Sequence, residues 1–151
     1  MVEGANIFFT TEARTGLQES GVLMIKDSSA NKTGVICSSY EIIASLLLSP
    51  EEFRSIKDVY VEEVIQILRD KAGEEAKLLF DEYRQNGGRI SLVELSLKVS
   101  DEINQVTDTL LEVFEKDPES VLKDPMYQQI LVCHVPPVLS QKFADRIEHL
   151  P

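Results

Sequence analysis

Apolar residues recur every three or four positions, the spacing of an α-helix, through most of the chain after residue 48. The starts of these helices are also marked. Ser49-Pro50-Glu51-Glu52 and Ser91-Leu92-Val93-Glu94 have the composition of N-terminal capping boxes. Further starts, each involving a proline, are indicated at Asp117-Pro118, Asp124-Pro125 and Pro136-Pro137. The pattern predicts that residues 49–151 form an all-helical region.

The pattern before residue 49 combines helix and strand. Thr10 is a suitable N-cap for a short helix over residues 11–20, and Gly21 is suited to end it. Residues 22–25 form a continuous apolar run of strand length, and the chain begins at what we interpret as the end of an earlier strand. These elements predict a βαβ unit with two short parallel strands. Residues 35–48 are apolar on most faces, which predicts a buried helix.

Two polar patches follow the predicted strand ends. Residues 3–6 and 29–35 each place one asparagine, Asn6 or Asn31, among small residues. Open α/β sheets bind ligands at the carboxyl ends of their strands, and a side-chain amide both donates and accepts hydrogen bonds. We interpret the patches as two ligand-facing loops of a nucleotide-binding half-domain. From spacing alone, the alternative that each asparagine closes a turn or caps a helix is favoured.

Charge and composition narrow the classes of partner. The chain has 15 basic and 26 acidic residues, a formal net charge of −11, and most of this charge falls after residue 48. We expect no nucleic-acid partner, because such a chain replaces few of the counterions around phosphates. We expect no membrane partner either, since the longest apolar run, residues 42–48, is too short to span a bilayer. Two cysteines and an N-terminus without a basic signal region indicate a reducing intracellular compartment.

Other candidate chemistry is sparse. His134 and His149 each lack a second histidine or cysteine at metal-ligand spacing, so we expect structural or surface roles for both and no metal site. Neither standard glycine-rich phosphate loop is present. The amphipathic helices after residue 49 could bind a partner helix, but packing on one another is favoured, because each has its own apolar stripe.

The two patches and their surroundings resemble one continuous block of the glutamate dehydrogenases, and the resemblance covers about residues 2–53. It is strongest with the large-subunit, NAD-specific class. It rests on the order and spacing of Val2-Glu3-Gly4-Ala5-Asn6, Thr10, Glu12-Ala13, Lys26-Asp27, Ser29-Ala30-Asn31-Lys32, Gly34-Val35, Ser38-Ser39 and Glu41. The resemblance implies a mainly α fold with a small Rossmann-like α/β remnant. Residues 1–48 would be the carboxyl-terminal end of a Rossmann-like NAD-binding domain, and residues 49–151 a helical C-terminal region.

The resemblance also implies a reaction and roles. The family oxidatively deaminates L-glutamate to 2-oxoglutarate and ammonia and transfers hydride to NAD. Asn6 matches an asparagine expected near the cofactor ribose, and Asn31 one expected near the nicotinamide. Gly34 matches a glycine of close approach to the cofactor. Val35 matches a residue that packs on the substrate, and Ser38 a serine that binds the substrate carboxylate.

The chain also departs from the family pattern. Thr33 stands where the family usually has the first of two glycines, and Cys37 stands where a serine is common. The family's catalytic lysine and aspartate and its glycine-rich dinucleotide turn precede the matching block. We therefore expect a C-terminal fragment that is inactive in isolation, and no catalytic residue is assigned to it.

The oligomeric state and the cellular location of the protein are inferred separately. We expect a homo-oligomer in the cytoplasm, or in the mitochondrion if the source is a eukaryote. A non-catalytic helical interaction module is the alternative interpretation of the chain.

Overall fold

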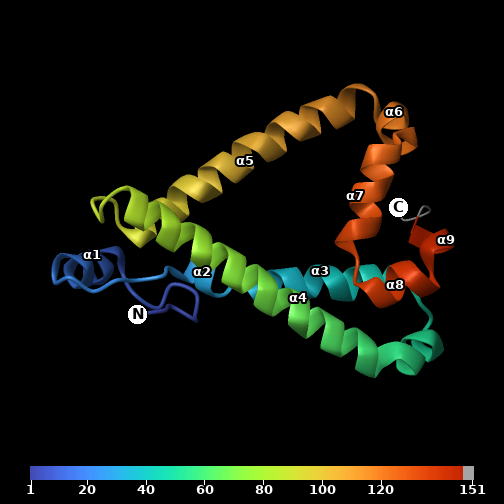
Figure 1. Cartoon of the computed structure of the whole chain (residues 1–151), viewed down its shortest axis with the longest axis horizontal. Helices are drawn as coiled ribbons and strands as arrows, with labels where there is room; N and C mark the ends of the chain where they lie inside the picture. The colour runs from blue at the N-terminus through green and yellow to red at the C-terminus, as the bar shows by residue number, and fades with distance from the viewer. Residues whose placement is uncertain (148–151) are drawn as a thin grey trace. The chain divides into compact units, whose positions relative to one another are not determined.

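The computed structural model describes residues 1–147 (Figure 1). Most of them are helical, which confirms the helical part of the predicted fold class. The helices, in chain order, are α1 (Thr11–Glu19), α2 (Asp27–Ala30), α3 (Lys32–Leu47), α4 (Pro50–Gln85), α5 (Leu92–Lys116), α6 (Pro118–Lys123), α7 (Pro125–His134), α8 (Pro137–Lys142) and α9 (Ala144–Ile147).

The two longest helices begin at the predicted capping boxes. The Ser49 backbone N–H donates to Glu52 Oε2 at 2.8 Å, and the Glu52 N–H donates back to Ser49 Oγ at 3.3 Å. Ser91 and Glu94 make the same exchange at 3.0 and 3.2 Å. Each box satisfies backbone donors that a helix start leaves without partners. The predicted starts of α4 and α5 are therefore confirmed.

Several shorter helices, α1, α6, α7 and α8, also begin where the sequence predicts, whereas α2 and the separate α9 were not predicted and α3 begins three residues earlier than expected. Thr10 caps α1 by accepting from the Ala13 N–H at 3.2 Å. The side chains of Asp117 and Asp124 cap α6 and α7 in the same way, each followed by a proline in the first turn. The expectation of a helical region after residue 48 is thus confirmed as far as residue 147.

The two predicted N-terminal strands are wrong. Between residues 1 and 147 the structure contains no strand, only one isolated parallel bridge between Val2 and Ile25. The Glu3 N–H donates to Ile25 O at 3.0 Å, and the Ile25 N–H donates to Met1 O at 2.9 Å. Parallel strands are typical of sheets covered on both faces, and here one short segment meets one other. The Rossmann-like remnant is therefore not formed within the described residues.

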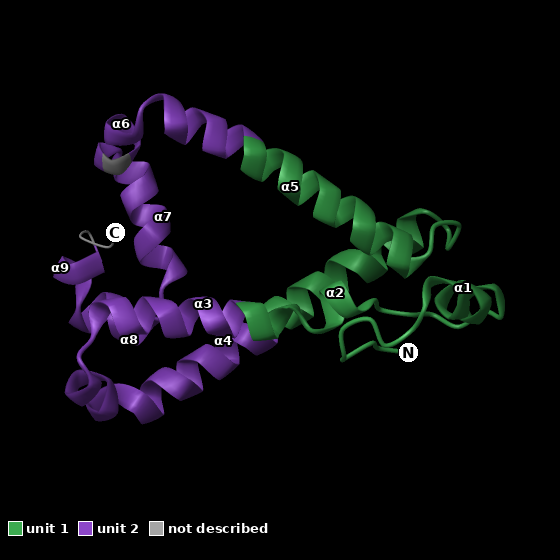
Figure 2. Cartoon of the chain, turned by 180° about the vertical axis from the view of Figure 1, so that it is seen from behind, with its two compact units in different colours: residues 1–35, 70–108 green, residues 36–69, 109–151 purple. Residues whose placement is uncertain are grey.

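The chain divides into two compact units, and three helices contribute to both (Figure 2). Unit 1 contains residues 1–35 and 70–108, and unit 2 contains residues 36–69 and 109–151. These units cut across the domain boundary predicted at residue 48. That boundary concerned the organisation of a longer enzyme, so it stays a prediction.

The core of unit 1 forms where α4 and α5 meet. Leu79 of α4 packs with Leu92 and Leu95 of α5, and all three are at most 4% exposed. Around them lie partly buried apolar residues from the same helices, from the turn that joins them and from the segment before α2: Ile25, Phe80, Tyr83, Ile90 and Val99. This core anchors the segment that carries one of the two polar patches.

The core of unit 2 is larger and includes one face of α3. Its members come from α3, α4 and the last helices: Tyr40, Ala44, Leu47, Leu48, Ile56, Tyr60, Val64, Val135, Val138, Leu139 and Ile147. The opposite face of α3 is not buried, because Val35 is 74% and Ile42 is 59% exposed. The expectation of a helix buried nearly all round is therefore wrong for that face. No helix within residues 1–147 has the length and apolar character to cross a membrane.

Candidate functional site

The two predicted polar loops meet in unit 1. The Asn31 side-chain amide donates a hydrogen bond to Asn6 Oδ1. Asn31 caps the end of α2, and its backbone N–H donates to Asp27 O at 2.9 Å. Asn6 lies on the exposed loop between the bridge at Val2 and the start of α1. The expected proximity of the two amides is therefore present, although the sheet predicted beneath them is not.

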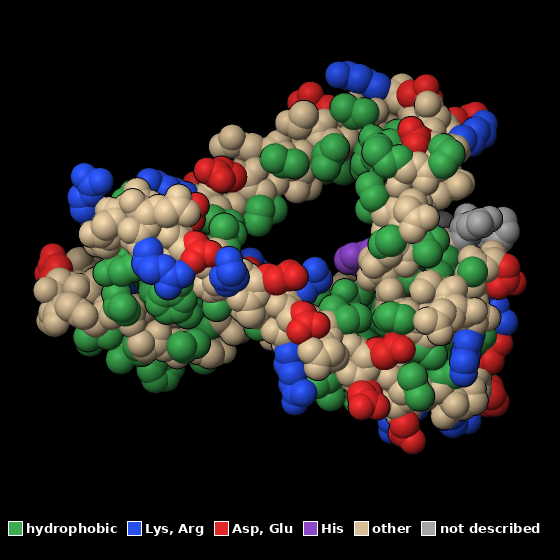
Figure 3. Space-filling view, in the orientation of Figure 1, with side chains coloured by type: hydrophobic (Ala, Val, Ile, Leu, Met, Phe, Trp, Pro, Cys, Tyr) green, Lys and Arg blue, Asp and Glu red, His purple; other side chains and the backbone are tan. Residues whose placement is uncertain are grey.

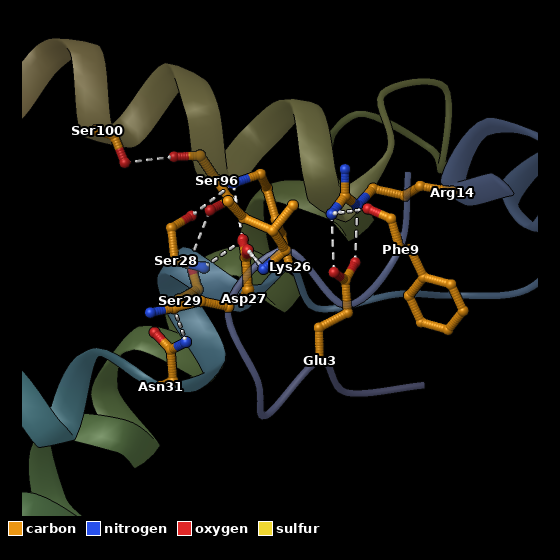
Figure 4. A network of polar contacts seen from close by, with 12 residues as sticks. Glu3, Phe9, Arg14, Lys26, Asp27, Ser28, Ser29, Asn31, Ser96 and Ser100 are labelled. Carbon is orange, nitrogen blue, oxygen red and sulfur yellow. Dashed lines mark hydrogen bonds and ion pairs between the residues drawn. The ribbon is translucent and has the colours of Figure 1, made fainter. Parts of the chain in front are cut away.

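Asp27 joins the two loops through its carboxylate. Its Oδ2 accepts from the Ile7 N–H at 2.8 Å, and its Oδ1 accepts from the Ser28 N–H at 2.7 Å and from Lys26 Nζ at 2.8 Å (Figure 4). The residue is only 7% exposed. The hydrogen bond from Lys26, followed by that from the Ile7 N–H, lowers the pKa of Asp27 to about 2. The carboxylate is therefore charged at neutral pH, with hydrogen bonds at both oxygens.

A buried ion pair holds the base of the first loop. Arg14 Nε and Nη2 donate to the two Glu3 carboxylate oxygens at 2.7 and 2.8 Å (Figure 4). The side chains are 10% and 0% exposed, respectively. The hydrogen bond to Glu3 raises the pKa of Arg14. Such a two-point contact fixes geometry as well as charge, so α1 is tied to the start of the loop that carries Asn6.

The first loop contains a strained residue next to Asn6. Ile7 has a backbone φ of 52°, the only positive value for a non-glycine residue among those described. A β-branched residue in this region is an outlier that costs ~1–3 kcal/mol. Its side chain does not pack into a core, because Ile7 is 84% exposed and Phe8 is 69% exposed. The conformation is held by the hydrogen bond from the Ile7 backbone N–H to the side-chain carboxylate of Asp27.

The second loop is tied to the long helices of unit 1. Lys32 donates to Glu75 of α4, and the hydroxyl oxygens of Ser29 and Ser96 of α5 lie 2.6 Å apart (Figure 4). Ser96 is 2% exposed. Asn31 lies between these two anchors in sequence, so its position follows from the packing of α4 and α5.

The other predicted site residues lie on α3. Gly34 and Val35 belong to its first turn, and Ser38 follows three residues later, so Val35 and Ser38 share one side of the helix. All three are exposed. No described atom lies within 4 Å of a Cβ built at Gly34, apart from its own local backbone, and its φ is not positive. The packing of the chain therefore does not require glycine there. Roles in binding cofactor or substrate stay predictions for Asn6, Asn31, Gly34, Val35 and Ser38.

The two departures from the family pattern also lie near the start of α3. Thr33 is half-buried in the first turn. Cys37 is half-buried, and its thiol contacts Glu41 Oε1 at 3.7 Å. Burial, with the charge of Glu41, raises the pKa of Cys37. The thiol is therefore protonated at neutral pH and packs as a small apolar group.

The candidate site is an open surface. A groove of about 750 Å³ in unit 1 is lined by α1, the segment before α2 and the start of α5, and it includes Arg14, Lys26 and Tyr83. Neither Asn6 nor Asn31 lines it. Asn6 is exposed and Asn31 is half-buried, so a large ligand bound at the two amides would need further walls to be enclosed.

The histidines and acidic residues add no metal centre to the described part of the chain. In residues 1–147, no three or more side chains of His, Cys, Asp and Glu gather as metal ligands would. The His134 ring lies 5.7 Å from the Tyr40 ring, a packing contact. His149 lies outside the described residues.

Sequence reasoning missed three of the residues that shape the site. Asp27 and Arg14 receive no role from local patterns, and Ser96 lies 67 positions from its partner Ser29. A signal for Arg14 was available, since Glu3 and Arg14 are opposite charges flanking apolar segments. For Asp27 the signal was its place just before a short polar stretch, where a side chain often accepts from the next backbone N–H.

Comparisons with known proteins point to the same family as the motif resemblance. The profile of the family described as Glutamate/Leucine/Phenylalanine/Valine dehydrogenase matches residues 1–95. The NAD-specific glutamate dehydrogenase of Saccharomyces cerevisiae is 39% identical over 123 residues, which cover 74% of this chain and 11% of that protein. Its Neurospora crassa counterpart of the same name is 34% identical over 140 residues, which cover 83% of this chain and 13% of that protein.

A third relative gives the same result. Glutamate dehydrogenase 2 of Dictyostelium discoideum is 36% identical over 121 residues, covering 73% of this chain and 11% of that protein. The chain thus spans only about a tenth of the length of the curated relatives it matches. No solved structure matches it. Because the family profile covers more than half of the residues, the chain belongs to the glutamate/leucine/phenylalanine/valine dehydrogenase family.

Proposed function

We propose that this chain is part of an NAD-dependent glutamate dehydrogenase. The enzyme would oxidatively deaminate L-glutamate to 2-oxoglutarate and ammonia, and NAD, when bound, would accept the hydride. The observation that carries the proposal is the hydrogen bond between Asn31 and Asn6. These are the two residues that the family resemblance assigns to the cofactor, and they come from loops 25 positions apart.

The chemistry of the two amides fits a nucleotide cofactor. Their mutual bond uses one donor of Asn31 and one acceptor site of Asn6. An amide pair has further donor and acceptor capacity, which suits a ribose hydroxyl or a carboxamide. We therefore assign Asn6 to the ribose side and Asn31 to the nicotinamide side. Gly34 would allow close approach of the cofactor, since the chain itself does not need glycine at that position.

The substrate would lie along the exposed side of α3. Val35 offers an apolar surface that is 74% exposed, and the Ser38 hydroxyl lies on the same side of the helix. We assign Val35 to packing on the substrate side chain and Ser38 to hydrogen bonding with a carboxylate of glutamate or 2-oxoglutarate. A hydroxyl donates well to a carboxylate, and such bonds are among the stronger ones.

The isolated chain should not turn over substrate. The family's catalytic lysine and aspartate are not assigned to any of its residues, and the groove in unit 1 does not include either asparagine of the proposed cofactor surface. We expect no glutamate-dependent formation of NADH by the 151-residue chain, measured by absorbance against an enzyme-free control. Robust turnover by this chain would contradict the assignment of catalysis to other parts of the enzyme.

A chimeric enzyme tests the functional assignment itself. The segment of the Saccharomyces cerevisiae enzyme that aligns with this chain would be replaced by the corresponding residues of this sequence. We expect the chimera to assemble like its parent and to form NADH from glutamate and NAD. A chimera that assembles and melts like its parent, yet shows no turnover, would overturn the proposal.

We also propose that the enzyme is a homo-oligomer. Support comes from apolar side chains at the surface of α5 and α7 (Figure 3). They include Ile103, Val106, Leu110, Leu111, Val113, Met126, Ile130 and Leu131, each at least 37% exposed. Clusters of exposed large apolar side chains are typical of interfaces. We further propose a cytoplasmic location, or a mitochondrial one in a eukaryote. The thiols of Cys37 and Cys133, both free, support a reducing compartment, and cell fractionation would test it.

A further inference from the structure

We propose that Asp27 is a positioning residue for the cofactor surface. It holds the strained backbone at Ile7 and thereby keeps Asn6 beside Asn31. The part of this inference that concerns the cofactor rests on the proposed function. The part that concerns the loop rests only on the geometry of this chain.

The two oxygens of Asp27 accept hydrogen bonds from different segments of the chain. Oδ2 accepts from the Ile7 N–H at 2.8 Å, and Oδ1 accepts from the Ser28 N–H at 2.7 Å. The first contact joins residues 20 positions apart, while the second is local. The carboxylate therefore bridges the loop that carries Asn6 to the start of α2, the short helix whose opposite end is capped by Asn31.

Ile7 needs such a contact more than its neighbours do. Its φ of 52° lies in a region that β-branched residues rarely adopt. Side-chain packing offers little compensation, because Ile7 is 84% exposed. Strained backbone persists where the surroundings hold it, and such positions cluster at binding sites. The hydrogen bond from Ile7 to a buried, charged acceptor is the contact that holds it here.

The other fixed points of the loop lie away from its tip. Arg14 donates hydrogen bonds to Glu3 at the first end of the loop. Its Nη2 also donates to Phe9 O, at 3.5 Å, near the other end of the loop. Asn6 and Ile7 lie between these points. Among the contacts that the structure describes within residues 1–147, the tip is held by Asp27 and Asn31, so without Asp27 the contact between the two asparagines would remain.

A simpler role for Asp27 predicts different behaviour. Asp27 also stabilises the start of α2 through Ser28 and pairs with Lys26. If that were its whole function, its replacement would have the same effect whatever residue stood at position 7. Glycine populates positive φ readily. If Asp27 acts by holding Ile7, then Ile7→Gly should remove most of the dependence on Asp27.

The first measurement uses the 151-residue chain and does not involve the cofactor. Amide hydrogen exchange by NMR would be recorded at Ile7 for the wild type, Asp27→Ala, Asp27→Asn and Asp81→Asn. Asparagine keeps one acceptor oxygen in place of two, so it cannot serve both loops. We expect exchange at Ile7 about tenfold faster in both Asp27 variants, as expected for a loss of about 1.4 kcal/mol. The control Asp81→Asn, which removes a paired carboxylate on α4, should leave it unchanged.

The second measurement uses the chimeric enzyme in a double-mutant cycle. We expect Asp27→Ala to raise KM for NAD about tenfold, with KM for glutamate nearly unchanged. In the Ile7→Gly background, the same replacement should raise KM for NAD by less than about threefold, a coupling of at least about 0.7 kcal/mol. If Asp27→Ala does not fold, Asp27→Asn carries both comparisons.

The possible outcomes distinguish the positioning role of Asp27 from the proposed function of the chain. Equal effects of the Asp27 replacement in both backgrounds, or unchanged exchange at Ile7, would overturn the positioning role. Faster exchange at Ile7 without any change in KM for NAD would keep the loop geometry and contradict its link to the cofactor. A chimera that is inactive with Asp27 intact would count against the proposed function and leave the exchange result to decide the loop.

Discussion

Glu3 and Arg14 form an ion pair that lies almost entirely out of water, next to a loop that is otherwise exposed. Breaking a buried pair leaves one charge desolvated and unpaired, which typically costs ~3–5 kcal/mol. We therefore expect Arg14→Met to lower the free energy of unfolding of the isolated chain by about 3 kcal/mol. Urea denaturation followed by circular dichroism would measure it.

An exposed ion pair of the same chemistry provides the control. Arg54 and Glu51 lie 3.3 Å apart on α4, and both side chains are more than 70% exposed. Arg54→Met should change the free energy of unfolding by less than about 0.5 kcal/mol. The double replacement Glu3→Leu with Arg14→Met should recover most of the loss. Similar small effects of Arg14→Met and Arg54→Met would contradict the burial of the first pair.

Asp27 should make the stability of the chain depend on pH in the acid range. Hydrogen bonds from Lys26 and from the Ile7 N–H lower its pKa from 3.8 to about 2. A lowered folded-state pKa gives stability that is fully present above pH 3.8 and is lost as the pH falls through about 2. The shift corresponds to about 2 kcal/mol.

The test is the difference between the wild type and Asp27→Asn. Glu52, with a pKa of about 2 set by its hydrogen bond from Arg146, loses stability over an overlapping range and contributes equally to both proteins. We expect the stability gap between the two proteins to shrink as the pH falls from 5 to 2 in thermal melts. A gap that stays constant over that range would show that Asp27 titrates normally.

At the residue scale, the sequence predicted which two loops lie close together, but it did not predict the hydrogen bonds that hold them there. Asn6 and Asn31 could be expected to meet, because each follows a segment that was expected to lie beside the other. The same reasoning could not find Asp27, because a carboxylate that accepts from a backbone N–H 20 positions away leaves no periodic signal. The strained φ of Ile7 was equally hidden, since isoleucine is a residue that normally avoids it.

At the scale of single elements, α4 should tolerate one stabilising change. Gly73 lies in the middle of this 36-residue helix and is exposed, and no atom outside its own helix backbone lies within 4 Å of an added Cβ. Glycine in a helix interior is less favourable than alanine by roughly 0.5–1 kcal/mol. We expect Gly73→Ala to raise the free energy of unfolding by that amount, measured in urea.

Gly88, in the turn that follows the same helix, is the matched control. Its φ is +71°, and a Cβ there would lie 3.0 Å from the Tyr83 hydroxyl oxygen. Gly88→Ala should therefore lower the free energy of unfolding, by ~1 kcal/mol or more. Equal signs for the two replacements would contradict the placement of Gly73 inside the helix and Gly88 in the turn.

The helices could be predicted because their signals are local. Capping boxes at Ser49 and Ser91, and aspartate–proline pairs at Asp117 and Asp124, act within four residues of each helix start. A strand depends instead on what lies beside it. The apolar run at residues 22–25 has the composition of a buried strand, but within the described residues it makes a single bridge, to Val2. The strand propensity of these residues could not reveal that so few backbone groups of a neighbouring segment pair with them.

At the scale of the whole molecule, the exposed apolar stripe of α5 should govern self-association. Ile103, Val106 and Leu110 share one side of the helix and are 52%, 60% and 43% exposed. We expect the isolated chain to associate at high concentration and Val106→Glu to shift it toward monomer in size-exclusion chromatography. The control Asn104→Glu, at a polar exposed position of the same helix, should have no effect. A strictly monomeric wild type would contradict this role of the stripe.

The central claim is that Asn6 and Asn31 act together as one cofactor surface of a glutamate dehydrogenase. The most direct test is KM for NAD in the chimeric enzyme carrying Asn6→Ala, Asn31→Ala or both, with Asn104→Ala as the control. The account predicts that each single replacement raises KM for NAD about tenfold and that the double replacement raises it by less than the product, because the residues are in contact. An unchanged KM for NAD in both single variants would contradict it.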